Sequence, residues 1–228
     1  MTTPTLDFDL ARFHMIEQQI RPWDVLDPSV LALLAVMKRE DFVPPAYRNL
    51  AFTDVEVPLD IEGVVPNSAK MFQPRVEARV LQELNVGPDD TVLEIGAGSG
   101  FMAALLAARA RHVTTVEIEP ALARFAEANL ARAGVRNAKV VVADGARGLP
   151  DLGSFDVIVI SGGLAMLPPA FVSQLKIGGR LCAFVGAGTV MEALLLTKTG
   201  EQSAEQRNLF ETRVPLLRNA ELPSTFRF

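Results

Sequence analysis

Three patterns of apolar and polar residues follow one another along the chain. In residues 1–86, apolar side chains recur at the spacing of one helix face, beginning with Leu10, Phe13, Ile16 and Ile20. This spacing predicts that the first stretch is mostly helical. The middle of the chain alternates between strand and helix patterns, and the last part resembles a strand pair.

Two further helices are predicted in the first stretch. Asp27 precedes Pro28, which is the typical order of an N-cap and a first helical residue. The run 30–37 that follows is almost entirely apolar and predicts a buried helix. Pro74 opens a third helix, in which apolar residues recur every three or four positions. The segment 52–72 has no regular period, and we expect it to be irregular.

Residues 87–186 alternate between short apolar runs and helix patterns. The predicted strands are 91–95, 112–117, 139–142, 155–160 and 180–185. The predicted helices are 101–110, one from Pro120 that Gly134 ends, and a short one within 167–175. This order predicts an α/β fold with a doubly wound, mostly parallel sheet. Residues 187–228 predict an antiparallel pair, with strands at 193–199 and 208–216 and a loop at 200–206.

Composition narrows the class of protein. A chain of 228 residues, 49% of them hydrophobic, fits one α/β domain with a substantial core. The net charge of −5 argues against a general nucleic-acid partner, which needs a concentrated basic face. No run reaches the roughly 20 apolar residues of a membrane helix, and the N-terminus lacks a signal-peptide pattern. We therefore expect a cytoplasmic protein without membrane attachment.

Cysteine and histidine offer little chemistry. The single cysteine, Cys182, excludes an internal disulfide and lies in an apolar run, which favours a buried hydrophobe over a reactive thiol. The two histidines, His14 and His112, lie far apart in the sequence, so no Cys/His metal cluster is predicted.

Candidate ligand-binding residues lie at the ends of three successive predicted strands. The first predicted strand leads into the loop Gly96-Ala97-Gly98-Ser99-Gly100, where glycines let the backbone approach a ligand closely. The second strand ends at Glu117, whose carboxylate is suited to ribose hydroxyls, and the third leads to Asp144-Gly145, which is suited to an adenine. Ligands bind at this edge of open α/β sheets. The alternative is a purely structural role, in which the glycines form a tight turn and Glu117 and Asp144 are helix caps.

The spacing of the glycines discriminates between nucleotides. A dinucleotide-binding motif would place its third glycine at position 101, which is Phe101. The block Val92 to Gly100 instead resembles the cofactor motif of class I S-adenosylmethionine-dependent methyltransferases, which have a Rossmann-like sheet. This resemblance implies that Glu94 helps to order the loop, that the loop faces the methionine part of the cofactor, that Glu117 holds the ribose and that Asp144-Gly145 faces the adenine. The implied cofactor-binding set is Glu94, Gly96, Ala97, Gly98, Ser99, Gly100, Glu117, Ile118, Asp144, Gly145 and Ser161.

The first stretch points to one family. The segments 12–21, 39–44 and 51–59 resemble the N-terminal region of protein-L-isoaspartate O-methyltransferases, and the resemblance continues to about residue 186. It implies methylation of the free α-carboxylate of L-isoaspartyl residues in damaged proteins, which is a protein-repair reaction. Such a carboxylate is already ionised at neutral pH, so no general base is required and no catalytic residue is predicted. We expect one methyltransferase domain over 1–228, with a helical substrate segment at 1–86, a cofactor-binding sheet at 87–186 and C-terminal strands at 187–228.

Two segments depart from the family pattern. Where the family carries a motif close to Gly-Gln-Thr-Ile-Ser-Gln-Pro, this chain has 68–74, with Lys70 at the threonine position and Phe72 at the serine position. Lys70 either attracts a carboxylate substrate or is a solvated lysine, and Ser68 is a candidate replacement hydroxyl. Arg75 either pairs with a substrate carboxylate or is exposed. After the fourth strand, the family's usual Thr-Ala-Ala is replaced by 161–163, Ser-Gly-Gly.

These departures leave alternatives open. The leading hypothesis is an isoaspartyl methyltransferase that acts on a protein or peptide carboxylate. The second is a methyltransferase of the same lineage with another acceptor, such as a small molecule. The third is a catalytically silent module that binds S-adenosylmethionine, and a nicotinamide oxidoreductase is a distant fourth. Trp23 either lines a peptide cleft or packs the N-terminal segment against the sheet, and the latter is favoured.

Overall fold

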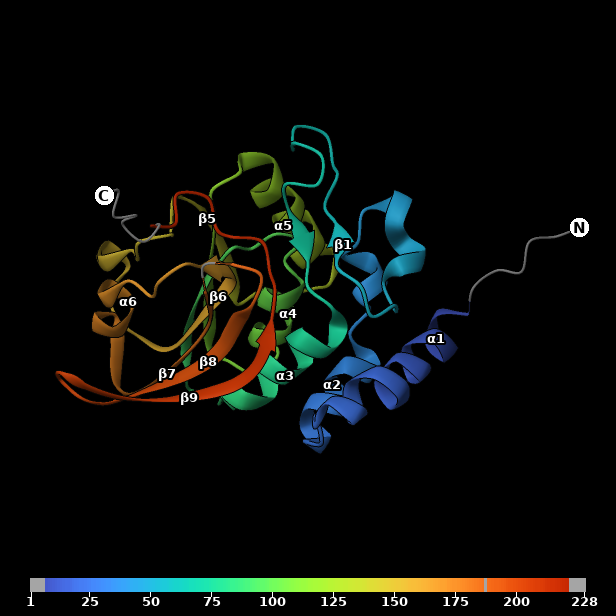
Figure 1. Ribbon diagram of the computed structural model, residues 1–228. Helices are drawn as coiled ribbons and strands as arrows, with labels where there is room; N and C mark the ends of the chain where they lie inside the picture. The colour runs from blue at the N-terminus through green and yellow to red at the C-terminus, as the bar shows by residue number, and fades with distance from the viewer. Residues whose placement is uncertain (1–6, 187, 222–228) are drawn as a thin grey trace, which may run out of the picture.

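The computed structural model describes residues 7–186 and 188–221 (Figure 1). The α-helices are α1 Phe8–Met15, α2 Pro28–Val36, α3 Pro74–Leu84, α4 Phe101–Ala107, α5 Pro120–Arg132 and α6 Pro169–Ser173. The strands are β1 Val57–Pro58, β2 Lys70–Met71, β3 Thr91–Ile95, β4 His112–Glu117, β5 Ala138–Val142, β6 Phe155–Leu164, β7 Leu175–Val185, β8 Met191–Gly200 and β9 Ser203–Thr212. A π-helical turn covers Ile16–Ile20, and 3-10 turns cover Arg21–Trp23, Arg39–Asp41, Pro45–Leu50 and Pro150–Leu152.

The central sheet has seven strands in the order β5-β4-β3-β6-β7-β8-β9. The pairs from β5 to β7 are parallel, whereas β8 and β9 add antiparallel strands at one edge. The chain passes from β3 outward to β5 and then returns to β6 on the other side of β3. The strand order therefore reverses between β3 and β6, which is where open α/β sheets bind ligands.

Successive side chains along each central strand point to opposite faces of the sheet, and each face packs against its own hydrophobic core. Val92, Val157 and Cys182 face the larger core with α3, α4 and the N-terminal segment, while their neighbours Leu93 and Ile158 face a smaller core that α6 covers. Figure 1 shows α6 and α3–α5 on opposite sides of the sheet. Because both faces are covered, the central strands are apolar almost throughout, as in other parallel sheets.

The helical pattern of the first stretch is confirmed, but part of its predicted apolar face is exposed. The side chain of Asp27 accepts hydrogen bonds from the backbone of Ser29 and caps α2. Ile16 and Ile20 are buried, whereas Leu10 and Phe13 are more than half exposed. The buried face of α1 instead contains Met15 and an arginine, because Arg12 bonds the buried Glu40. Trp23 packs edge-on against Phe210 of β9, with 4.8 Å between ring centroids, as the favoured alternative predicted.

Several predicted boundaries were wrong. The helix predicted to reach residue 110 ends at Ala107, the strand predicted at 155–160 continues to Leu164, and the strand predicted at 180–185 begins at Leu175. The segment 52–72 is irregular except for the short pair of β1 and β2. Residues 200–206 are not a loop, because β8 and β9 run almost to the turn at 201–202. Residues 203–208 of β9 are exposed at the sheet edge and are polar except for Ala204, so the sequence carried no apolar alternation to reveal them.

Candidate active site

A cavity opens at the carboxyl ends of β3, β4 and β6, on the reversal point of the strand order. Its volume is about 950 Å³ when the open solvent at its mouth is counted. Besides the predicted residues described below, its lining contains Leu59, Met71, Glu77, Ile95, Met102, Val116, Leu122, Ala143, Ala146, Gly162 and the C-terminal residues Pro215, Leu216, Leu217 and Arg218.

The glycine loop forms one wall. Gly96 has a φ of 95°, and a Cβ there would lie 2.9 Å from the carbonyl oxygen of Ser161, so that position requires glycine. The backbone N–H of Gly98 donates to Glu117 Oε2 at 2.9 Å. The carboxylate at the end of β4 therefore holds the loop that follows β3.

Glu94 lies beneath this loop and is completely buried. Its carboxyl oxygens accept hydrogen bonds from Thr115 Oγ1 at 2.7 Å and Ser161 Oγ at 2.9 Å. Burial, with the charges of Glu117 and Glu77 adding to it, raises the pKa of Glu94 to about 8, although the two hydroxyls lower it. A buried acid that lines a cavity and titrates near neutral pH is suited to receiving a cationic ligand.

Glu117 and Asp144, which also line the cavity, lack a cationic partner too. Glu117 Oε1 accepts from the backbone N–H of Glu119, and Asp144 Oδ2 accepts from Asn219 Nδ2 at 2.9 Å. No ion pair between the residues that the structure describes includes Glu94, Glu117 or Asp144. Three of the four acidic residues that line the cavity therefore have no cationic partner in the described chain, whereas Glu77 pairs with Arg39.

The structure brings most of the sequence-predicted site residues together at this cavity. Those that line it are Glu94, Gly96, Ala97, Gly98, Ser99, Glu117, Ile118, Asp144, Gly145 and Ser161, with Ser68, Lys70 and Phe72 from the departing segment. Gly100 does not line it: its φ is 83°, and it packs against the backbone of Ala126 in α5. Arg75 also lies elsewhere, because its guanidinium pairs with Asp54 at 2.7 Å and stacks on Trp23.

The departing segment has a clear local structure. Phe72 is 7% exposed and packs edge-to-face on Phe184, and its carbonyl accepts a hydrogen bond from the buried Arg39, which also pairs with Glu77. Lys70 is partly exposed, and its Nζ donates to Glu56 at 3.1 Å. An aromatic ring and an ion-paired ammonium therefore stand beside the cofactor-motif residues.

Sequence reasoning missed the contribution of the C-terminal segment. The backbone N–H of Gly163 donates to the carbonyl of Pro215 at 2.8 Å, and that of Leu217 donates to the carbonyl of Gly163 at 2.9 Å. A Cβ on Gly162 would lie only 2.4 Å from the side chain of Leu217. Glycine at positions 162 and 163 thus admits this segment into the site, and the two glycines were the one signal in the sequence.

Comparison with a protein-family model decides the family. The model described as "Protein-L-isoaspartate(D-aspartate) O-methyltransferase (PCMT)" matches residues 11–221. The chain belongs to this family. The family predicted from the N-terminal and sheet motifs is confirmed, and with it the methyltransferase class.

Individual relatives agree with the family model. A protein-L-isoaspartate O-methyltransferase of Rhodopseudomonas palustris is 42% identical over 205 residues, which cover 89% of this chain and 91% of the relative. One solved protein-L-isoaspartate O-methyltransferase superposes with a TM-score of 0.75 at 24% identity, covering 90% of this chain and 65% of the solved one. A putative protein-L-isoaspartate O-methyltransferase from Plasmodium falciparum, solved with S-adenosyl-L-homocysteine, superposes with a TM-score of 0.75 at 18% identity. The match covers 94% of this chain and 99% of the solved one. The predicted class I methyltransferase fold is confirmed.

Among the described residues, none of the helices combines the length and apolar character needed to cross a membrane. Nor do residues 7–186 and 188–221 gather three or more His, Cys, Asp or Glu side chains in an arrangement that would hold a metal ion. Cys182 is fully buried, and burial raises the pKa of its thiol to about 12, which agrees with the predicted inert core residue.

Proposed function

We propose that this chain transfers the methyl group of S-adenosylmethionine to the α-carboxylate of L-isoaspartyl residues in proteins or peptides. The observation that carries the proposal is the match of residues 11–221 to the isoaspartyl methyltransferase family, in a chain whose cavity lies at the strand ends that bear the cofactor motif. Repair of damaged proteins is the role that follows from such an activity. A cytoplasmic location stays a prediction from the sequence.

The residues of the cavity fit the cofactor. Glu117 would accept hydrogen bonds from ribose hydroxyls while holding Gly98, and Asp144 with Gly145 would face the adenine. Glu94 would face the cationic methionine end beneath the loop. The cofactor supplies an electrophilic methyl group on a sulfonium. We also propose that residues 1–86 supply the acceptor side of the site, since 68–72 line the same cavity as the glycine loop.

The methyl transfer requires little acid–base chemistry from the protein. A carboxylate oxygen forms a bond to the methyl carbon as the bond from carbon to sulfur breaks, and the sulfonium becomes a neutral thioether. The acceptor is ionised at neutral pH, so no side chain needs to remove a proton. The protein contributes alignment and the removal of water from the carboxylate, for which Phe72 and Met71 provide an apolar wall.

The same wall favours a second candidate, a methyltransferase with another acceptor. Phe72 and the ion pair of Lys70 with Glu56 change the acceptor side relative to the family motif. A smaller carboxylate with an apolar body would suit such a wall.

One assay separates these functions. The protein is incubated with methyl-labelled S-adenosylmethionine and a peptide that carries either L-isoaspartate or L-aspartate at one position. The proposal predicts a base-labile methyl ester on the isoaspartyl peptide only. If no such ester forms although the protein binds S-adenosylhomocysteine tightly, the result would favour the second candidate, a methyltransferase with another acceptor.

A further inference from the structure

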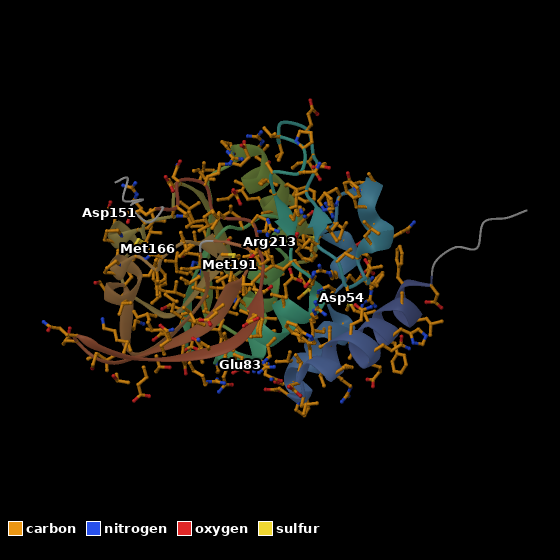
Figure 2. The ribbon with its side chains drawn as sticks, in the orientation of Figure 1. Asp54, Glu83, Asp151, Met166, Met191 and Arg213 are labelled. Carbon is orange, nitrogen blue, oxygen red and sulfur yellow. The ribbon has the colours of Figure 1, made fainter. Side chains whose placement is uncertain are left out.

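A second cavity adjoins the cofactor cavity on the acceptor side. It measures about 960 Å³ with its mouth included. Lys70, Pro215 and Leu216 line both cavities, so the two spaces meet at these residues. The remaining lining residues are Glu56, Gly186, Gly188, Met191, Arg213 and Val214. Figure 2 shows Met191 and Arg213 close together, where β8 begins and β9 has ended.

Two cations stand in this second cavity. Lys70 donates from Nζ to Glu56, and both side chains are less than one-third exposed. Arg213 is exposed and makes no ion pair with any residue in the described part of the chain. Since Glu56 is the one acidic residue in the lining, the second cavity carries an excess of one positive charge. Such an excess matches a single carboxylate.

Both cations stand on a fixed frame. Lys70 belongs to β2 and pairs with Pro58 of β1. The segment that follows Arg213 is anchored to β6 by the two backbone hydrogen bonds of Gly163. Lys70 therefore stays at the junction of the cavities, where a carboxylate must lie to meet a methyl group in the cofactor cavity.

The rest of the lining suits the body of an acceptor. Met191 and Val214 are buried, and Pro215 and Leu216 add apolar surface to the lining. A peptide segment can place aliphatic atoms against this surface while its carboxylate turns toward Lys70.

We propose that Lys70 and Arg213 form the carboxylate-recognition site for the methyl acceptor, with Lys70 binding the carboxylate to be methylated and Arg213 drawing it into the second cavity. This inference rests on the proposed function. It assigns acceptor specificity to two residues outside the cofactor motif.

The test combines acceptor kinetics with cofactor binding. Lys70→Met, Arg213→Met and Lys70→Arg are compared with wild type, using an isoaspartyl peptide as acceptor and calorimetry with S-adenosylhomocysteine. Loss of a charge-assisted hydrogen bond predicts an acceptor KM raised about tenfold or more in Lys70→Met and about threefold in Arg213→Met. Lys70→Arg restores most of the loss. In Arg213→Met the affinity for S-adenosylhomocysteine stays within about twofold of wild type, because Arg213 lines the second cavity and not the cofactor cavity.

A matched control is Lys176→Met. Lys176 also pairs with a carboxylate, Asp156 at 2.7 Å, but it lies at the opposite end of the sheet and should leave the acceptor KM unchanged. A second probe is the same peptide with its isoaspartyl α-carboxylate converted to an amide, used as a competitive inhibitor. Wild type should bind the carboxylate peptide about tenfold more tightly than the amide, and Lys70→Met should lose this preference.

The outcomes are distinct. An isoaspartyl KM that is unchanged in both methionine variants overturns the assignment of Lys70 and Arg213 and leaves the proposed function intact. If wild type forms no methyl ester on the peptide, the proposed function itself fails and the assignment fails with it. If Lys70→Met does not fold, the exposed Arg213→Met and the amide probe on wild type decide the question.

Discussion

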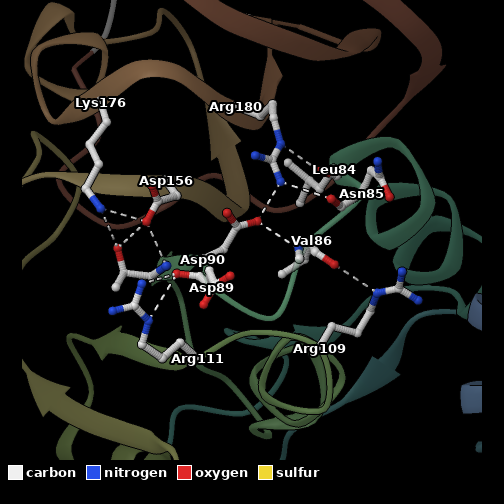
Figure 3. Close-up of polar contacts among 12 residues, drawn as sticks. Leu84, Asn85, Val86, Asp89, Asp90, Arg109, Arg111, Asp156, Lys176 and Arg180 are labelled. Atoms are coloured by element: carbon white, nitrogen blue, oxygen red, sulfur yellow. Dashed lines mark hydrogen bonds and ion pairs between the residues drawn. The ribbon is translucent and has the colours of Figure 1, made fainter.

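Acidic side chains at the two ends of the parallel strands have opposite surroundings. At the amino ends, shown in Figure 3, Asp156 pairs with Lys176 and Asp90 pairs with Arg180, each at 2.7 Å. Partial burial raises the pKa of Asp156, but Lys176 and two hydrogen bonds from Thr91 outweigh it, and the resulting pKa is about 2. These carboxylates are satisfied by the protein itself.

At the carboxyl ends the arrangement is reversed. Glu94 and Glu117 accept hydrogen bonds only from neutral groups of the described chain, and burial raises the pKa of Glu94 to about 8. Burying acidic groups without a cation costs stability. The carboxyl groups without a cationic partner lie at the end of the sheet where the cavity opens. A binding site for a cationic cofactor requires such carboxyl groups.

Glu77 offers the sharpest contrast, because it lines the cofactor cavity and yet has a cationic partner. Arg39 and Glu77 are both buried, and Arg39 also bonds the carbonyl groups of Ala51 and Phe72. Arg39→Met should therefore lower the free energy of unfolding by about 3–5 kcal/mol, the largest effect that we predict, since Glu77 would remain as an uncompensated buried acid. Denaturant unfolding measures this.

The control for this substitution is Arg124→Met, on the exposed face of α5, which should change stability by less than about 0.5 kcal/mol. The double variant Arg39→Met with Glu77→Leu should recover part of the loss. If Arg39→Met lowered the free energy of unfolding no more than Arg124→Met does, the ion pair with Arg39 would not be what distinguishes Glu77 from the other acidic residues of the cavity.

The unusual pKa of Glu94 predicts pH-dependent cofactor binding. In the free protein Glu94 is largely protonated below its pKa of about 8, and a cationic ligand favours the ionised form. The affinity for S-adenosylmethionine should therefore rise with pH, by up to about tenfold between pH 6 and 8, and level off above pH 8.

Glu94→Gln should flatten this pH profile, because it removes the carboxyl group whose burial raises its pKa to about 8. Calorimetry in two buffers of different ionisation enthalpy measures the proton released on binding. A profile that is equally steep in wild type and in Glu94→Gln would assign the pH dependence to another group.

Asp156 at the opposite end should affect stability alone. Because its folded pKa of about 2 lies below its ordinary value of 3.8, its contribution to stability is present above pH 4 and lost as the pH falls toward 2. Asp156→Asn should cost about 1 kcal/mol at neutral pH and less in acid. Thermal unfolding at pH 3 and pH 7 measures the difference, and a larger cost at pH 3 than at pH 7 would contradict the account.

Much of the fold could be predicted from the sequence, because local signals and tertiary structure agree there. The N-cap at Asp27, the proline at the start of α3 and the apolar parallel strands each follow from short-range chemistry. The exposed Leu10 and Phe13 could not be predicted, since the buried pair of Arg12 with Glu40 takes the inner face of α1. The start of β9 also escaped prediction, because hydrogen bonds to β8 fix it without apolar side chains.

The site was predictable to a similar degree. Strand ends bearing glycines and acids indicated the cofactor side, because parallel strands bring their carboxyl ends together. The acceptor side depends on Arg213 and on 214–217, which lie more than a hundred residues from Lys70 in the sequence. No local pattern marks these residues. The backbone hydrogen bonds of Gly163 with Pro215 and Leu217, and the packing of Leu217 over Gly162, bring them to the cavity.

The most direct test of the account compares two isosteric substitutions at the two ends of the sheet. S-adenosylhomocysteine binding is measured by calorimetry on wild type, Glu117→Gln and Asp156→Asn. We expect Glu117→Gln to weaken binding about tenfold or more, because a ribose would lose its charged acceptor, and Asp156→Asn to stay within about twofold of wild type. Equal affinities for all three proteins, or a larger loss in Asp156→Asn, would contradict the assignment of the unpaired carboxylates to the cofactor.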